Sequence, residues 1–132
     1  MKILRTILHP WVIISLFFII LITGESIGGV YLFYLLLGIP HGLTHSILGF
    51  TGVILLLMGY YKINNKKLLR KTLLILGTIC MCLSLYYFFH NDRQSYNHGS
   101  FKTAAFWTTF LLFVISALIF IVIDNPKREH NT

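Results

Sequence analysis

The sequence predicts an all-α integral membrane protein, a four-helix transmembrane bundle with a short re-entrant or interfacial half-helix between spans one and two. Two observations predict this class. Of the 132 residues, 56% are hydrophobic and only 11% are charged, which is less than half of the roughly 25% found in soluble domains. The apolar residues also gather in runs close to the ~20 residues that a helix needs to cross a ~30 Å hydrocarbon layer. We therefore expect one integral membrane domain covering residues 1–132.

The first span is expected at about residues 3–23. Residues 11–22 are apolar except for Ser15 but are too few to cross, so the helix has to begin before His9 and Pro10. Proline lacks an amide hydrogen and is best tolerated in the first turn of a helix. A secretory signal peptide is the competing interpretation, but residues 23–26 are a poor match to a small-x-small cleavage site. We therefore expect this segment to be retained as span one.

A second apolar run, residues 30–37, is too short to cross a bilayer alone and lies between Gly28 and Pro40. Two interpretations of residues 28–38 remain open. The segment forms a re-entrant or interfacial half-helix, or it extends span one into a long, tilted helix with Glu25 near its middle. The first interpretation is favoured, because a lone carboxylate in hydrocarbon costs at least a few kcal/mol.

Three further apolar segments reach crossing length unaided, and we expect spans two to four at about residues 43–61, 70–89 and 104–123. Two of the eleven basic residues, Arg93 and Lys102, fall on one side of these spans. The other nine fall on the opposite side: Lys2, Arg5, Lys62, Lys66, Lys67, Arg70, Lys71, Lys127 and Arg128. Cytoplasmic loops carry the excess of positive charge, so both termini are predicted to be cytoplasmic. The richness in Lys, Asn and Ile is compatible with a bacterial plasma (inner) membrane.

Four histidines and two carboxylates fall on the predicted outer side. His41 and His45 are four residues apart, a spacing that places two side chains on one face of a helix. Neutral imidazole binds zinc, copper, iron and nickel, and histidine also ligates haem. The candidates for a transition-metal, haem or proton-handling site are His41, His45, His90, His98, Glu25 and Asp92. The alternative is that they are interfacial groups, solvated or hydrogen-bonded to loop carbonyls.

Small side chains recur along span two, on the helix face that carries the histidine pair. Small residues let the backbone of a neighbouring helix approach closely. We therefore assign five residues to helix packing: Gly42, Ser46, Gly49, Gly52 and Gly59. Hydroxyl side chains within the spans, among them Ser84 and Thr109, are expected to form hydrogen bonds between helices.

The stretch Pro-His-Gly-Leu-Thr-His-Ser at residues 40–46 resembles a short piece of a family of membrane-bound metal-dependent hydrolases. That family carries a His-Arg…Thr-His-Ser stretch, with further acidic residues near a Pro-Asp motif. The resemblance covers about six of the 132 residues. The arginine and the Pro-Asp motif are absent, and the two histidines are one residue closer together. Hydrolase activity is therefore not carried over to this chain.

The sequence also lacks a Gly-rich phosphate loop, a His-Glu-x-x-His motif and a Gly-x-Ser-x-Gly motif, so an enzymatic function is not favoured. The net charge of +7 does not indicate nucleic acid, because the apolar runs indicate a lipid bilayer instead. Three hypotheses remain. The chain is an accessory, regulatory or structural component that acts through helix contacts with another membrane protein or with itself. Alternatively, it binds a metal or haem at the outer histidines, or it is a small multimeric transporter.

Overall fold

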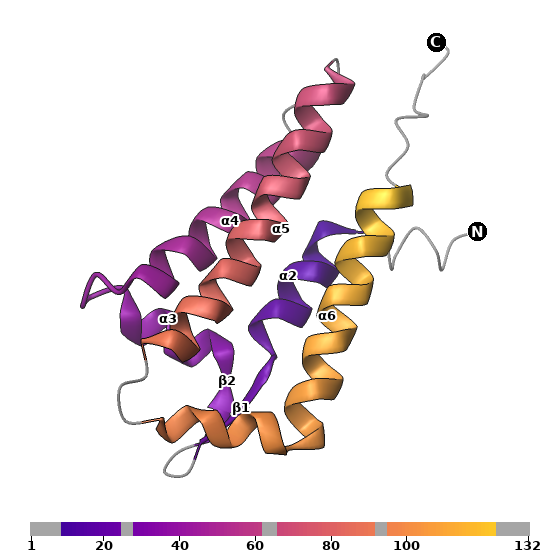
Figure 1. Ribbon diagram of the computed structural model, residues 1–132. Coiled ribbons are helices and arrows are strands. Elements are labelled where there is room, and N and C mark those ends of the chain that lie inside the picture. The colour runs from indigo at the N-terminus through magenta and orange to yellow at the C-terminus, as the bar shows by residue number, and fades with distance from the viewer. Residues whose placement is uncertain (1–8, 25–27, 62–65, 92–94, 124–132) are drawn as a thin grey trace.

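The computed structural model describes residues 9–24, 28–61, 66–91 and 95–123. Figure 1 shows a long antiparallel helix pair, α4 and α5, with α2 between this pair and α6. We call one end of the molecule, with the start of α2, the end of α6, the end of α4 and the start of α5, the terminal end, and the opposite end, with η1, the η1 end. In chain order the elements are α2 (Pro10–Phe18), β1 (Leu21–Thr23), β2 (Gly28–Val30), α3 (Tyr31–Gly38), α4 (Thr44–Tyr61), α5 (Lys67–His90), the 3-10 helix η1 (Tyr96–Lys102) and α6 (Ala104–Ile123).

Three helical segments are long and apolar enough to cross a membrane: Thr44–Tyr61, Leu68–His90 and Ala104–Ile123. They coincide with the second, third and fourth predicted spans. Their outward side chains are mostly large and apolar, as contact with hydrocarbon requires. The prediction of a multi-pass chain with long apolar helices is confirmed at this level.

The prediction of a continuous first helix at residues 3–23 is wrong over residues 19–23, whereas residues 3–8 lie outside the described residues. The fold is therefore not purely α-helical. Helix α2 ends at Phe18, and the chain becomes extended in β1, which pairs antiparallel with β2. The residues after Phe18 are Ile-Ile-Leu-Ile-Thr, and β-branched side chains favour extended backbone. The nine residues of α2 cover ~13 Å and the three residues of β1 ~10 Å, with Ile19 and Ile20 between them, so this helix-plus-strand segment approaches the ~30 Å thickness of the hydrocarbon layer.

Hydroxyl side chains of α6 and η1 satisfy backbone groups of the hairpin. The Leu21 amide donates to Thr109 Oγ1 at 3.1 Å, and the Thr23 amide donates to Ser100 Oγ at 3.0 Å. Thr109 Oγ1 also donates to carbonyls of its own helix, those of Ala105 and Phe106. A strand edge is compatible with an apolar environment only if its amides have partners inside the protein. These contacts supply them. Thr109 was expected to bond to another helix, and its partner outside α6 is instead the strand residue Leu21.

A short helix does follow the first segment, because α3 occupies Tyr31–Gly38. The alternative of one long tilted helix is wrong, since the β1–β2 hairpin separates α2 from α3. Glu25, which that alternative placed near the helix centre, lies outside the described residues.

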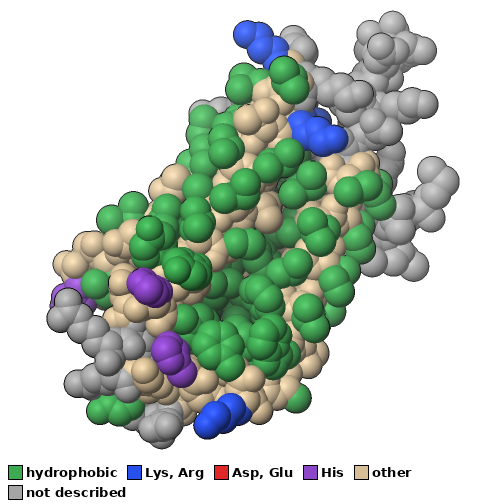
Figure 2. Space-filling view, viewed as in Figure 1, with side chains coloured by type: hydrophobic (Ala, Val, Ile, Leu, Met, Phe, Trp, Pro, Cys, Tyr) green, Lys and Arg blue, Asp and Glu red, His purple; other side chains and the backbone are tan. Residues whose placement is uncertain are grey.

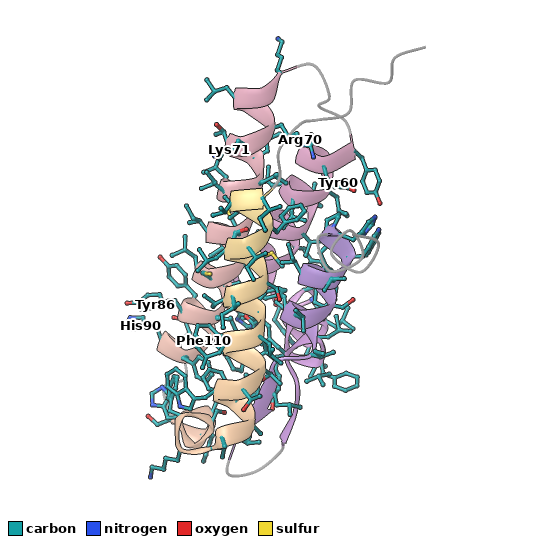
Figure 3. The ribbon with its side chains drawn as sticks, turned by 90° about the vertical axis from the view of Figure 1, so that its right-hand side faces the viewer. Tyr60, Arg70, Lys71, Tyr86, His90 and Phe110 are labelled. Atoms are coloured by element: carbon teal, nitrogen blue, oxygen red, sulfur yellow. The ribbon has the colours of Figure 1, made fainter. Side chains whose placement is uncertain are left out.

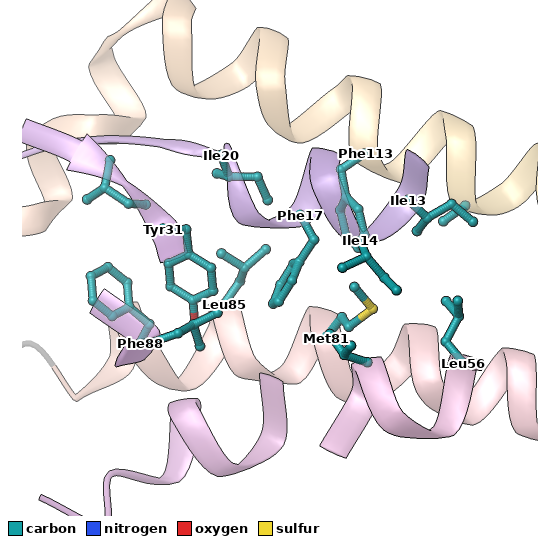
Figure 4. Packing of buried hydrophobic residues seen from close by; sticks show 14 of the residues in the cluster. Ile13, Ile14, Phe17, Ile20, Tyr31, Leu56, Met81, Leu85, Phe88 and Phe113 are labelled. Atoms are coloured by element: carbon teal, nitrogen blue, oxygen red, sulfur yellow. The ribbon is translucent and has the colours of Figure 1, made fainter. Parts of the chain in front are cut away.

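Buried side chains of α2 form the centre of the core. Figure 4 shows Ile13, Ile14 and Phe17 between α6 on one side and the α4–α5 pair on the other. The ring of Phe17 lies 5.3 Å from that of Tyr31 and 5.5 Å from that of Phe113, measured between centroids. Below α2, towards the η1 end, α5 and α6 share few contacts, and a cavity lies between them.

Candidate functional site

The two histidines at the start of α4 do not share a helix face, contrary to the spacing argument. Helix α4 begins at Thr44, so His41 lies in the preceding turn and is exposed, whereas His45 is buried. Gly42, between them, has φ of +61°, a left-handed conformation that interrupts helical geometry. The pair is therefore not a preformed two-histidine metal site.

Hydrogen bonds and ring packing hold His45 in place inside the protein. Its Nε2 atom donates to the Tyr34 carbonyl oxygen at 3.4 Å, and its ring packs edge-on against Phe88 at 5.3 Å. Its own carbonyl accepts a hydrogen bond from Ser84 Oγ, and the Tyr31 hydroxyl lies 2.8 Å from the same Oγ. Since Ser84 has one hydrogen and donates it to the carbonyl, Tyr31 is the donor to Ser84. This chain of bonds ties α3, α4 and α5 together, as expected for Ser84.

The small residues of α4 lie against other parts of the same chain. A Cβ on Gly49 would lie 2.7 Å from Leu35, and one on Gly59 would lie 3.1 Å from Leu73. Gly52 faces Gly77 of α5, which the sequence analysis did not single out.

Ser46 and Gly42 behave differently from the other small residues. Ser46 is buried beside Gly38, and its Oγ has no hydrogen-bond partner among the described residues. A Cβ on Gly42 would meet no atom within 4 Å. The assignment of Gly42 to helix packing is therefore wrong, because its role is to adopt positive φ in the turn.

His90 and His98 both line one cavity of about 460 Å³ at the η1 end. The cavity lies between α5, η1 and α6, and eight of its ten lining residues carry rings. Figure 2 shows apolar side chains around a hollow in this face, with histidine side chains towards the same end of the molecule. The lining residues are Cys82, Leu85, Tyr86, Phe89, His90, His98, Phe101, Phe106, Trp107 and Phe110.

The rings around the cavity are ordered by contacts with one another. On α5, the rings of Tyr86 and His90 are stacked, 5.5 Å apart and 10° from parallel. On α6, Phe106 and Phe110 are stacked in the same way, 5.7 Å apart and 7° from parallel. Figure 3 shows Tyr86, His90 and Phe110 towards the η1 end, far from Tyr60 and Arg70 at the terminal end.

Hydrogen bonds within the protein determine which donor and acceptor atoms of the cavity remain free to bind a ligand. His98 Nε2 lies 3.0 Å from the Phe89 carbonyl oxygen, which can only accept, so Nε2 carries the hydrogen. In neutral His98 the Nδ1 atom is then an acceptor. Trp107 Nε1 donates to the Phe101 carbonyl oxygen at 2.8 Å, so its indole contributes ring surface rather than a free donor. His90 makes no hydrogen bond to another described residue.

The four candidate histidines, all of them in the described part of the chain, do not form a common metal site. Among the described residues, no group of three or more His, Cys, Asp or Glu side chains could hold a metal ion. Of the four candidate histidines, His90 and His98 line a common cavity. Glu25 and Asp92 lie outside the described residues.

The sequence analysis missed the aromatic lining of this cavity. The available signal was helical spacing of aromatic residues, at positions 86, 89 and 90 on one span and 106, 107 and 110 on the next.

Comparison of the chain with protein-family models, with curated proteins and with solved structures gives no match. Function therefore has to be inferred from the geometry of the chain itself.

Proposed function

We propose that the chain is a non-catalytic multi-pass membrane protein that holds a small membrane-borne organic molecule in the cavity at its η1 end. The observation that carries this proposal is the cavity itself, about 460 Å³ and lined by eight rings with two imidazoles among them. Ligand sites in proteins are typically apolar, aromatic hollows of this order of size with a few polar groups. The cavity lies between two helices that are apolar enough to span a bilayer, so a ligand can enter from the lipid.

The proposed placement has both termini in the cytoplasm of a bacterial cell, and the cavity in the outer half of its plasma membrane. Among the described side chains, Lys66, Arg70 and Lys71 belong to the terminal end, and Lys102 belongs to η1. This asymmetry agrees with the greater positive charge of cytoplasmic loops. In this placement the α2–β1 segment is the first crossing, and α3 is an interfacial half-helix.

Mass spectrometry of the small molecules that co-purify with the protein tests this proposal. The untagged protein is purified in mild detergent, extracted with organic solvent and compared with Cys82→Trp, which fills the cavity. Leu83→Trp is the matched control, because Leu83 is also exposed on α5 but does not line the cavity. We expect one compound in near-equal amount to wild-type protein and Leu83→Trp, and its loss from Cys82→Trp. Equal extracts from all three proteins would contradict the proposal.

A second candidate function is an accessory role through helix contacts, with another membrane protein or a second copy as partner. The glycines of α4 are covered by α5 and α3, so such a partner would need another face. Helix α6 offers one, because it exposes a row of large apolar residues: Leu111, Leu112, Ile115, Leu118 and Ile119. Cysteine cross-linking at Leu111 and Ile115 in native membranes, with Phe113 as the buried control position, tests this role. The absence of any position-specific cross-link would count against it.

A further inference from the structure

The cavity at the η1 end has features that select among membrane-borne molecules. We propose that it binds a neutral lipid whose head is a planar ring with a hydroxyl group, as in a long-chain phenol or quinol. The ring lies among the aromatic side chains, the hydroxyl donates to His98 Nδ1, and the apolar tail extends into the bilayer. This inference rests on the proposed function and specifies its ligand class.

The shape of the lining favours a planar ring over a flexible chain alone. Each of the two helices contributes a pair of nearly parallel rings, Tyr86 with His90 and Phe106 with Phe110. Stacked pairs of this kind present extended ring surface, and aromatic contacts are favourable beyond the apolar area that they bury. Trp107 and Phe101 add further ring surface between them, with centroids 6.3 Å apart.

The charge of the lining favours a neutral head. None of the ten lining residues is Lys, Arg, Asp or Glu. Moving a phosphate or carboxylate into an apolar site without a counter-charge is strongly unfavourable. A phospholipid headgroup is therefore a poor match, although its acyl chains are not.

The hydrogen bonds of the lining residues favour a ligand whose head group donates a hydrogen bond. His98 Nε2 already donates to the Phe89 carbonyl oxygen, which leaves Nδ1 as an acceptor. Trp107 Nε1 also has a backbone acceptor already. A hydroxyl on the ligand supplies the hydrogen that Nδ1 lacks, whereas a ketone or an ether does not.

Tryptophan fluorescence tests this inference, because the chain has two tryptophans and only one lines the cavity. Trp107 is 44% exposed and Trp11 is 51% exposed, so both are open to lipid to a similar degree. Trp11 lies on α2, where its Nε1 donates to the Tyr61 hydroxyl at 3.2 Å. Trp11→Phe therefore leaves a reporter in the cavity, and Trp107→Phe leaves a matched reporter outside it.

The probes are a bromo-nonylphenol, its methyl ether and a brominated phosphatidylcholine, each added to protein in liposomes. Bromine quenches tryptophan on contact. In Trp11→Phe we expect saturable quenching by the phenol and about five- to tenfold weaker binding of the ether, the effect of one lost hydrogen bond. In Trp107→Phe we expect only a linear response. His98→Phe in the Trp11→Phe background should weaken binding of the phenol by the same factor and leave binding of the ether unchanged.

The outcomes separate this inference from the proposed function. Equal binding of phenol and ether, or no effect of His98→Phe, overturns the hydroxylated head. Saturable quenching of Trp107 by the brominated phospholipid but not by the phenol also overturns the hydroxylated head. In each of these cases, a compound found in the solvent extract still supports the proposed function. Linear quenching of both tryptophans by every probe, with no compound in the extract, refutes the inference and the proposed function together.

Discussion

Gly52 of α4 and Gly77 of α5 face each other across the helix pair with no room for a side chain. A Cβ on Gly52 would lie 2.7 Å from the Gly77 carbonyl oxygen, and a Cβ on Gly77 would lie 2.8 Å from the Gly52 carbonyl oxygen. Both obstacles are backbone atoms, which cannot rotate away. The contact lies near the middle of both helices and sets how closely α4 and α5 approach.

Gly52→Leu is therefore expected to disrupt the fold of the chain itself. Inserting a large side chain at this contact should lower the free energy of unfolding by about 3 kcal/mol. Loss of helical circular dichroism on titration with sodium dodecyl sulfate, in mixed micelles, measures this change. Thr51→Leu is the control, because Thr51 is the neighbouring residue and is exposed. Similar unfolding curves for the two variants would show that the close contact does not limit stability.

Ser84→Ala is expected to destabilise the protein more than Tyr31→Phe. Removal of the Ser84 hydroxyl leaves the buried Tyr31 hydroxyl without its acceptor and the His45 carbonyl without its donor. An unpaired buried polar group costs about 1–3 kcal/mol, whereas Tyr31→Phe removes the stranded group itself. The same unfolding titration measures all variants. The double variant should be less destabilised than the sum of the single ones, and strict additivity would mean that the two hydroxyls do not interact.

Thr109→Val is expected to loosen the β1–β2 hairpin. The substitution keeps the shape of the side chain but removes the oxygen that accepts from the Leu21 amide. We expect faster hydrogen exchange at Leu21, by about five- to tenfold, with little change in α4 and α5. Thr108→Val is the control, because the Thr108 hydroxyl donates to the Ala104 carbonyl in its own helix. Unchanged exchange at Leu21 in Thr109→Val would argue against this contact.

The three long spans could be predicted because a run of about 20 apolar residues has few stable alternatives in a bilayer. The end of helix α2 at Phe18 could not be predicted. Residues 19–23 are compatible with either helix or strand in an apolar setting, and the hydroxyls that stabilise the strand, on Ser100 and Thr109, are 77 and 88 residues away from their partners in sequence. Long-range partners of this kind override local preference.

The candidate site was predictable only in part, for a similar reason. His90 and His98 were singled out by their side of the membrane, and both line the cavity. Their relation to Phe106 and Phe110 depends on how α5 and α6 diverge, which no local pattern specifies. The His41–His45 pair failed because one backbone conformation, positive φ at Gly42, delays the start of α4.

The last prediction concerns metal content. We expect the untagged protein, purified without chelators, to carry no stoichiometric zinc, copper, iron or nickel and no haem absorbance band. The reason is geometric: His41 lies in a turn, His45 is bonded to the Tyr34 carbonyl, and no three ligating side chains of the described residues form a group. Elemental analysis and an ultraviolet–visible spectrum measure this directly, and omitting a histidine tag keeps the measurement free of tag-bound metal. One metal ion per chain, lost in His90→Ala with His98→Ala, would instead make the cavity histidines ligands, and the acceptor role inferred for His98 Nδ1 would have to be reassigned to the metal.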